Sequence, residues 1–377
     1  MPAPWAVESV TTPAAAGSGQ PQLTVSSRGV LLSWIERDET RATLRFAERT
    51  RTGWTEPHPV ASGTDWFVNW ADVPSVVRLA DGSLAAHWLQ KSAADTYAYD
   101  VRLSHSADDG RTWSASYTPH HDNTPTEHGF ASLFQMPGAG LGLIWLDGRG
   151  KDVMTVRFGS FDAGWKQTSE MLVDARVCDC CPTAAVVTSE GPLVAFRDRS
   201  EGEIRDISVS RLEKGAWTTP RTIHDDGWKI PACPVNGPML SARGRDVVIA
   251  WFTVAEHQGR VFAAFSADGG RTFGTPIRVD DEGALGRVDV ELMPDGSAAV
   301  SWIEFAQERA QFRVRRVERS GTRGAFTTVA GIEESRASGY PRIALHNGEL
   351  VFAWTESREG KLHVRTAAAQ AAVDTDR

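Results

Sequence analysis

The sequence lacks several features that would point to a membrane or a nucleic acid. No apolar run approaches the roughly 18 residues of a membrane helix, and the opening MPAPWAVESV has neither segment of a signal peptide. Basic residues form no run interleaved with aromatics, and the formal net charge is −8. We therefore expect no nucleic-acid partner and no membrane span.

Cysteine and tyrosine are also scarce, with four of each among 377 residues. A chain of this length can form one large domain or two to three ordinary ones, and its composition does not decide between them. The few tyrosines restrict any catalytic role for that residue to Tyr97, Tyr99, Tyr117 and Tyr340.

An internal repeat decides the fold class. Seven apolar phrases, from LLSWIER to LVFAWTE, each carry an aromatic followed by a polar or charged residue, and they recur every 51 to 57 residues. Their aromatics are Trp34, Trp88, Trp145, Phe196, Trp251, Trp302 and Trp354. This period is too long for helical hairpins and is typical of a four-stranded propeller blade.

A second mark places the ends of the chain. An aromatic after Gly or Thr follows the first six phrases, as in TGWTEP and RTFGTP, whereas the seventh copy is found at the N-terminus as APWAVESV. We therefore predict an all-β chain forming a single domain, a seven-bladed β-propeller of four-stranded antiparallel blades in which residues 4–11 close the last blade. An open solenoid or a pair of β-sandwiches is the alternative. The expected blades lie near 21–62, 72–120, 127–174, 178–226, 233–281, 284–331 and 338–369.

Two turns carry a more specific pattern, S-x-D-x-G-x-T followed by an aromatic. They begin at Ser106 and Ser266, and a shortened relative begins at Ser160. This pattern resembles the Asp-box of the sialidase-like (BNR repeat) β-propellers. The resemblance implies that these turns are structural and lie away from the active site. Sialidases of the family have six blades, which makes a six-bladed ring a further alternative.

The resemblance also implies a catalytic set. Family sialidases use a tyrosine nucleophile paired with a glutamate, an aspartate acid/base and three arginines on the substrate carboxylate. Tyr340 precedes an innermost strand, Glu304 of the preceding blade could activate it, and Arg197 is a channel arginine. The arginine motif Arg-Ile-Pro of the family does not occur in this sequence.

The loops at one end of a propeller surround its channel and usually bind ligands. The repeat places a mixed ring of charged and polar residues there, which could hold a small polar or anionic ligand through bidentate arginines. Solvated loop ends are the alternative for each of them. The predicted ligand-binding residues are Arg149, Asp198, Arg199, Asn236, Arg287 and Arg358.

All four cysteines also fall in neighbouring loops of this ring. Cys178, Cys180 and Cys181 lead into the fourth blade and Cys233 into the fifth, so their sulfurs should converge. Structural disulfides are one interpretation. A soft metal such as copper or zinc is another, with His128 and His257 as extra ligands. Reduced or catalytic thiols are the third.

Function therefore stays open at this point. The stretches CDCCPT, EIRDI, ACPVNGP and VSWIE together resemble a bacterial sialidase-like subfamily of undefined activity. The first hypothesis is a periplasmic or secreted protein, its signal removed, that binds a metal ion or a small ligand at the channel mouth. A sialidase-like glycoside hydrolase and a scaffold for an unknown protein partner are the alternatives. A cytoplasmic location is not excluded.

Overall fold

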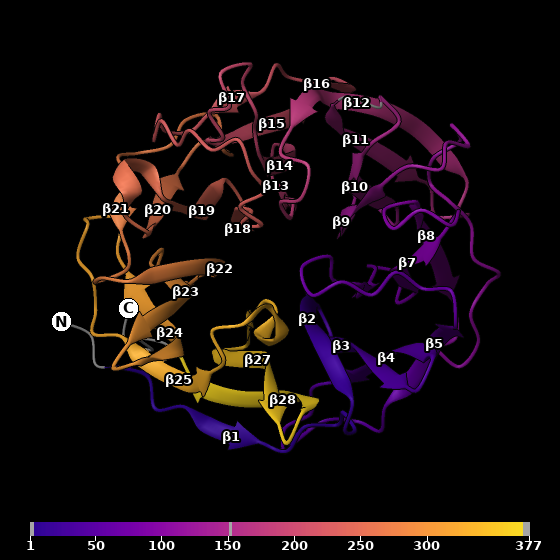
Figure 1. The fold of residues 1–377 in the computed structure, drawn as a ribbon, viewed down its shortest axis with the longest axis horizontal. Coiled ribbons are helices and arrows are strands. Elements are labelled where there is room, and N and C mark those ends of the chain that lie inside the picture. Colours follow the sequence, from indigo (N-terminus) through magenta and orange to yellow (C-terminus); the bar gives the residue numbers. More distant parts are fainter. Residues whose placement is uncertain (1–3, 151–152, 372–377) are drawn as a thin grey trace.

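The repeated apolar phrases form the second strand of each of seven antiparallel sheets, which are arranged as a ring (Figure 1). The computed structural model describes residues 4–150 and 153–371. Within them the protein is a seven-bladed β-propeller, as the repeat predicts, and not a six-bladed one. Its described helices are two single turns of three residues, so none is long or apolar enough to cross a membrane.

The first three blades run as follows, from the innermost strand outwards. Blade 1 contains β2 (Ser18–Ser26), β3 (Gly29–Asp38), β4 (Arg41–Glu48) and β5 (His58–Gly63). Blade 2 contains β6 (Ser75–Arg78), β7 (Leu84–Lys91) and β8 (Tyr99–Ser106). Blade 3 contains β9 (His128–Gln135), β10 (Leu141–Asp147), β11 (Met154–Phe161) and β12 (Gln167–Val177).

The other four blades follow the same order. Blade 4 contains β13 (Ala184–Thr188), β14 (Gly191–Arg197), β15 (Ile207–Glu213), β16 (Ala216–Trp217) and β17 (Arg221–Thr222). Blade 5 contains β18 (Met239–Arg243), β19 (Asp246–Thr253), the turn η1 (Ala255–His257), β20 (Arg260–Ser266) and β21 (Ile277–Arg278). Blade 6 contains β22 (Ala284–Leu292), β23 (Ala298–Ala306), β24 (Arg309–Val317) and β25 (Thr327–Ile332). Blade 7 contains β26 (Arg342–His346), β27 (Glu349–Arg358) and β28 (Lys361–Gln370), and the turn η2 (Arg336–Ser338) precedes it.

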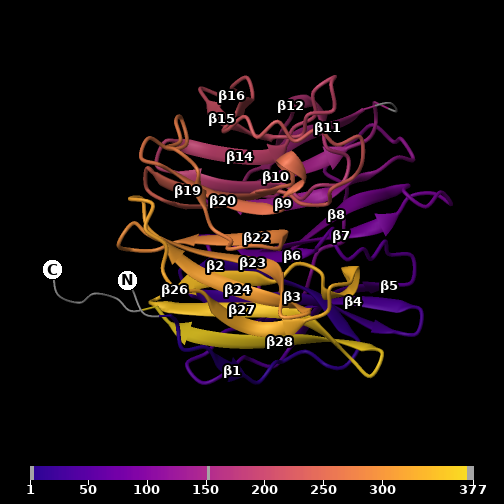
Figure 2. The same cartoon turned by 60° about the vertical axis from the view of Figure 1, so that its left-hand side comes forward.

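The N-terminal strand closes the ring, as predicted. β1 (Glu8–Val10) pairs with β28, with Ser9 opposite Ala367, and it lies along the outer edge of the last blade in Figures 1 and 2. The last blade thereby gains its fourth strand from the other end of the chain. This pairing covers an edge that would otherwise offer free main-chain groups to another chain.

Two blades depart from the four-stranded plan at their outer edge. In blade 2 the fourth position holds only an isolated bridge between Leu103 and Tyr117. In blade 4 the outer strand is divided into β16 and β17, with Pro220 between them. Proline has no N–H to donate, which explains the break in blade 4.

The repeated tryptophans lie between neighbouring blades. Trp34, Trp145, Trp251 and Trp302 are fully buried. Trp145 of blade 3, for example, shares a core cluster with Tyr99 and Leu103 of blade 2. The sheets therefore bury their aromatic residues against the next blade, which orders the ring without helices.

The two S-x-D-x-G-x-T turns are built alike. In the first, Asp108 accepts hydrogen bonds from the main-chain N–H of Thr112 at 2.9 Å and from its hydroxyl at 2.7 Å, and Ser106 donates to the same carboxylate at 2.8 Å. Asp268 has the equivalent partners in Thr272 and Ser266. These bonds lower the pKa of Asp108 to about 2. The aspartates therefore stabilise their own turns.

Candidate functional site

A cavity of about 590 Å³ opens between the loops of blades 2, 3 and 4. Its lining residues are Asp95, Thr96, Tyr97, Ala98, Pro125, Thr126, Glu127, Gly148, Val153, Met154 and Asp179. These residues come from the segments that lead into β8, β9 and β13 and from the β10–β11 loop. All of these lie at the same end of the ring, because alternate strands of each blade start there.

Glu127 lies in the wall of this cavity and is held by Tyr99. The Tyr99 hydroxyl donates a hydrogen bond of 2.5 Å to Glu127 Oε1, and the Tyr99 ring is fully buried and stacks on Phe67 with 4.0 Å between ring centroids. Burial, with the nearby charge of Asp179, raises the pKa of Glu127 to about 7. The buried tyrosine thus orients the glutamate and does not itself face the cavity.

A second carboxyl lies behind the first. Asp72 accepts a hydrogen bond of 2.7 Å from the Phe130 N–H, and burial raises its pKa to about 8, helped by the charge of Glu127. A Cβ atom at position 129 would collide with both Asp72 and Tyr99, so the close packing here requires Gly129.

Asp179 faces the same cavity from the cysteine loop. Arg199 Nη1 donates to both of its carboxylate oxygens, at 3.1 and 3.2 Å, and Arg199 also bonds Glu203. The aspartate is 40% exposed, so it is accessible from the cavity. Glu127 and Asp179 thus enter one cavity from two adjacent blades.

Disulfide bonds hold this loop in place. Cys178 pairs with Cys181, with Cα atoms 5.8 Å apart, and Cys180 pairs with Cys233, with Cα atoms 6.0 Å apart. The convergence predicted from the repeat is therefore present, and of its three interpretations the structure contains the disulfides. The bond to Cys233 joins the loops of blades 4 and 5. A close group of three sulfurs, Cys178, Cys180 and Cys181, contains no histidine among the described residues.

Four of the sequence-predicted residues meet around the loop at 233–237. Arg197 donates to the main-chain carbonyls of Asn236, Arg205 and Phe252, at 2.7, 2.5 and 2.6 Å. Asn236 Oδ1 accepts the Arg287 N–H at 2.7 Å, and the Tyr340 hydroxyl donates to the Val235 carbonyl.

These contacts make the group structural. Arg197 is 1% exposed, and burial lowers its pKa to about 10. Tyr340 is 2% exposed, and burial raises its pKa well above its ordinary value. Both groups have their hydrogen-bonding atoms turned to the protein, so they join blades and do not present themselves to a ligand.

Glu304 does not pair with Tyr340. It accepts hydrogen bonds from Trp302 Nε1 at 2.6 Å and from Arg313 at 2.5 Å. The same arrangement recurs in blade 1, where Glu36 binds the indole N–H of Trp34 and the guanidinium of Arg45. Glu304 thus belongs to a repeated structural motif, in which the carboxylate two residues after a tryptophan accepts hydrogen bonds from the indole N–H and from an arginine on the next strand.

The remaining predicted residues are dispersed. Arg149 binds Asp147 through two nitrogens, and Asp198 accepts the Ser208 hydroxyl at 2.8 Å. Arg358 is exposed at the end of β27, His257 is exposed in η1, and His128 is buried beside His120 at the start of β9. Glu127 and Asp72, which precede β9 and β6, are not among the site residues predicted from the sequence. The bond between Glu127 and Tyr99 has no sequence signal, because Tyr99 belongs to a different blade from Glu127.

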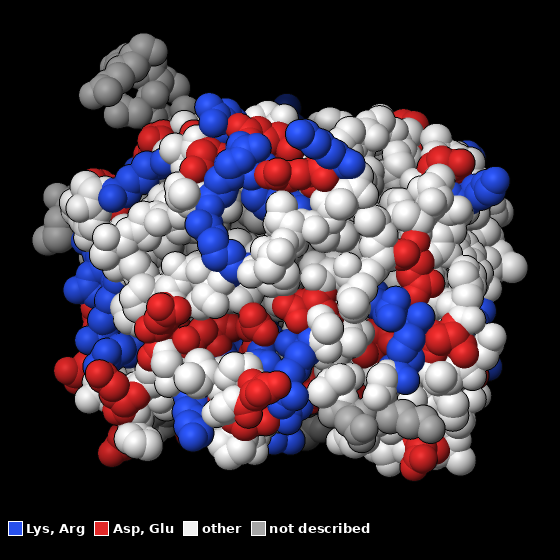
Figure 3. Space-filling view, turned by 90° about the horizontal axis from the view of Figure 1, so that it is seen from above, with Lys and Arg blue, Asp and Glu red and all other residues white. Residues whose placement is uncertain are grey.

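Figure 3 shows the outer side of the ring, at 90° to the view of Figure 1, and there lysine and arginine side chains are interspersed with aspartate and glutamate. No extended surface of one sign covers the described residues of this face.

Comparison with known proteins rests on structure alone. No family and no curated protein matches the sequence. A Dyadobacter fermentans protein of unknown function is 13% identical with a TM-score of 0.56, each chain being covered to 97%. The α-L-arabinofuranosidase Arb93A of Fusarium graminearum is 12% identical with a TM-score of 0.51, over 79% of this chain and 92% of that one.

The K499G mutant of NanB sialidase from Streptococcus pneumoniae is 10% identical with a TM-score of 0.50, over 90% of this chain and 83% of that one. The chain has the fold of the sialidase-like β-propellers. At these identities the likeness establishes the fold and nothing about the reaction. Evidence about the activity therefore comes from the residues that line the cavity.

Proposed function

We propose that this protein is a glycoside hydrolase whose substrate binds in the cavity between blades 2, 3 and 4. The observation that carries the proposal is the placement of two carboxyl groups, Glu127 and Asp179, on loops from adjacent blades in one open cavity. Glycosidic bond cleavage uses such a pair, one carboxylic acid to protonate the leaving oxygen and one carboxylate for the attacking side.

The surroundings support different roles for the two groups. Glu127 is half-buried, and burial raises its pKa to about 7 although the hydrogen bond from Tyr99 acts to lower it, which suits a proton donor, whereas Asp179 is paired with Arg199 and would act on the attacking side. Glu127 would give its proton to the glycosidic oxygen as the bond to the anomeric carbon breaks. Asp179 would take a proton from the water that attacks this carbon.

The rim of the cavity offers a surface for a sugar ring. Tyr97 is 60% exposed, and its ring lies edge-on to Phe67. Asp95, Thr96 and Thr126 add polar groups to the lining. An exposed aromatic face beside hydrogen-bonding side chains is suited to a polyhydroxylated ring with one apolar face. Structural neighbours that include an arabinofuranosidase and a sialidase support a glycan substrate through the fold alone.

The test is hydrolysis of a panel of aryl glycosides that includes α-L-arabinofuranosides and sialosides. Replacement of Glu127 by Gln should lower kcat/KM by about 10²- to 10⁴-fold, the usual contribution of a positioned acid. The loss should be smaller for a dinitrophenyl leaving group than for a nitrophenyl one, because the former departs without protonation. Glu256→Gln, an exposed carboxyl in η1, is the matched control. Equal activity of the two variants would contradict the proposal.

We infer, secondly, that the reduced protein binds a soft metal ion such as copper. The sulfurs of Cys178, Cys180 and Cys181 lie within 4.8 Å of one another, which supports three thiolate ligands once the disulfides are opened. Copper should bind after reduction with a thiol-free phosphine and not before. Equal copper content of the oxidised and reduced forms would contradict this idea.

We infer, thirdly, that the protein functions in the periplasm or is secreted. Two disulfides in one loop cluster support this location, because such bonds persist in oxidising compartments and are rare in the cytosol. Fractionation of the producing cells tests it, with recovery of the protein only in the cytosolic fraction as the contrary result.

A further inference from the structure

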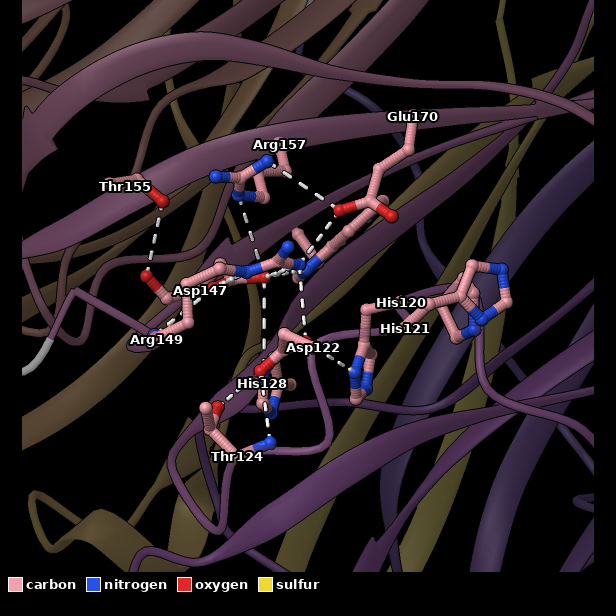
Figure 4. Close-up of polar contacts among 12 residues, drawn as sticks. His120, His121, Asp122, Thr124, His128, Asp147, Arg149, Thr155, Arg157 and Glu170 are labelled. Atoms are coloured by element: carbon pink, nitrogen blue, oxygen red, sulfur yellow. Dashed lines mark hydrogen bonds and ion pairs between the residues drawn. The ribbon is translucent and has the colours of Figure 1, made fainter.

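Two histidines and several carboxylates form a buried cluster between blades 2 and 3, close behind the proposed active site (Figure 4). His120 belongs to the connection between β8 and β9, His128 begins β9, and Asp100 lies in β8. Asp122 and Asp147 complete the surroundings of His128. None of these groups is required by the hydrolytic chemistry proposed above.

Of the four imidazole nitrogens, one has a hydrogen-bond partner: Nδ1 of His120 lies 3.1 Å from Asp122 Oδ1. His128 is completely buried and His120 is 4% exposed. Neither nitrogen of His128 makes a hydrogen bond, and neither does Nε2 of His120. Buried polar atoms are almost always bonded, so three unbonded ring nitrogens in one cluster call for an explanation.

The distances from these nitrogens to a neighbouring carboxylate supply an explanation. Asp100 Oδ1 lies 3.4 Å from His128 Nδ1 and 3.7 Å from His120 Nε2. Two ligands that bind one zinc ion at about 2.0–2.1 Å in tetrahedral geometry are separated by about 3.3 Å. The distance or the alignment therefore prevents a hydrogen bond from Asp100 Oδ1 to His128 Nδ1 or to His120 Nε2. The three atoms are nevertheless near enough to bind one ion together.

The net charge of the cluster also favours a bound cation. Among the described residues, the guanidinium groups that pair with Asp100, Asp122, Asp147 and Glu170 are two, those of Arg149 and Arg157. With neutral imidazoles the group carries two uncompensated negative charges. A divalent cation would offset them, and buried charge is costly without such compensation.

The position of the Arg149 guanidinium restricts the side of His128 on which a cation could bind. Its Nη2 is 2.7 Å from Asp147 and 3.3 Å from Asp122, so a positive group already occupies that side of His128. The opposite side, formed by Asp100, His120 and His128, contains no guanidinium among these contacts. Imidazole with carboxylate is a donor set that zinc accepts and that magnesium and calcium do not prefer.

We propose that Asp100, His120 and His128 bind a zinc ion that joins blades 2 and 3 behind the cavity. The two imidazole rings are stacked with 3.8 Å between centroids and 6° between planes. Ligation in both ring planes requires a rotation of His120, which lies outside the strands. Because Asp100 follows Tyr99 and His128 follows Glu127, the ion would anchor both strand ends that carry the tyrosine–glutamate pair.

The test measures zinc on the full-length oxidised protein after removal of metals with a chelator. We expect one equivalent of zinc to rebind and to raise the Tm. His120→Asn and Asp100→Asn should weaken zinc binding by at least about 100-fold, because even a residue that only orients a ligand is worth 10–100-fold. His121→Asn is the matched control, since His121 is turned away from the carboxylates and bonds Gln167 at 2.9 Å.

Cobalt separates this site from the cysteines. The cobalt-substituted protein should show the visible bands of nitrogen and oxygen ligands without a thiolate charge-transfer band. Circular dichroism would show which variants are folded, and His120→Asn decides the matter if His128→Asn fails to fold. The proposal is wrong if the wild-type protein binds neither zinc nor cobalt, if His120→Asn binds zinc as tightly as His121→Asn does, or if thiol alkylation after reduction removes the metal.

Discussion

At three junctions between blades, a single side chain accepts a main-chain N–H from the innermost strand of the next blade. Asp72 accepts the Phe130 N–H at 2.7 Å, and Asp289 accepts the Ile343 N–H at 2.9 Å. Asn236 does the same for the Arg287 N–H. Where this acceptor is an aspartate its carboxyl is buried, and burial raises the pKa to about 8 for Asp72 and to about 6 for Asp289. Proton binding is therefore coupled to the integrity of the ring.

Asp72→Asn should reduce the dependence of stability on pH. The folded pKa of Asp72 lies above its unfolded value near 3.8, so its stabilisation is complete below that value and is lost as pH rises through about 8. Asparagine keeps the acceptor for Phe130 and does not ionise. We expect the Tm of the wild-type protein to fall more than that of the variant between about pH 5 and pH 9. Asp225→Asn, an exposed change, should follow the wild type, and parallel curves for Asp72→Asn would contradict the assignment.

Glu304→Ala should cost about 3–5 kcal/mol of unfolding free energy, because it leaves the buried Arg313 guanidinium without a carboxylate and with only the neutral Gln311 side chain as hydrogen-bond partner. The equivalent change in blade 1, Glu36→Ala, should cost less, since Glu36 and Arg45 are 18% and 31% exposed against 2% and 6% for the blade 6 pair. Urea denaturation of both variants measures the difference. A loss of activity in Glu304→Ala without a loss of stability would return Glu304 to the catalytic role that its sequence suggests.

At the scale of elements, the cysteine loop is a short segment constrained twice. The bond from Cys178 to Cys181 closes a turn within the loop, whereas the bond from Cys180 to Cys233 spans 53 residues and joins two blades. Asp179 lies between Cys178 and Cys180 in the sequence and lines the cavity. The disulfides therefore position a residue of the proposed site and do more than hold the sheets.

Removal of the long-range bond with Cys180→Ser and Cys233→Ser together should cost about 2–4 kcal/mol. Removal of the short one, with Cys178→Ser and Cys181→Ser, should cost less if loop closure in the unfolded chain dominates. Guanidinium denaturation of both double variants measures this. The oxidised wild-type protein should contain no free thiol when unfolded without reductant, and titration of two or four thiols would contradict the pairing.

At the scale of the whole molecule, stability depends on closure of the ring. β1 contributes three paired residues to blade 7, and its neighbour Trp5 packs against the cluster that joins blades 6 and 7. Without this segment the edge of β28 would be open. An open sheet edge both weakens a propeller and pairs with other chains.

Deletion of residues 1–11 should therefore lower the Tm and produce aggregation that increases with protein concentration. A synthetic peptide of residues 4–11, added in excess, should restore part of the Tm, whereas a peptide of the same composition in scrambled order should not. Light scattering and thermal unfolding measure both effects. A truncated protein that stays monomeric with an unchanged Tm would show that closure by β1 is dispensable.

The repeat, the number of blades and the closure could be predicted because they depend on periodicity, which is a property of the sequence itself. The convergence of the cysteines followed from the same register. The working roles of Tyr340, Glu304 and Arg197 could not be judged in this way. A tyrosine that donates to the Val235 carbonyl and one that faces a channel have the same sequence context, and only the packing distinguishes them.

The sequence by itself determined the architecture, because a hydrophobic strand pattern repeated seven times has one efficient way to bury its tryptophans and to cover its edges. The tertiary structure decided the chemistry. Glu127 acquires its environment from Tyr99 in another blade, and His128 meets Asp100 across the same boundary. Desolvation and charge spacing act through space, so residues separated in the chain set the protonation and the ligand geometry of this site.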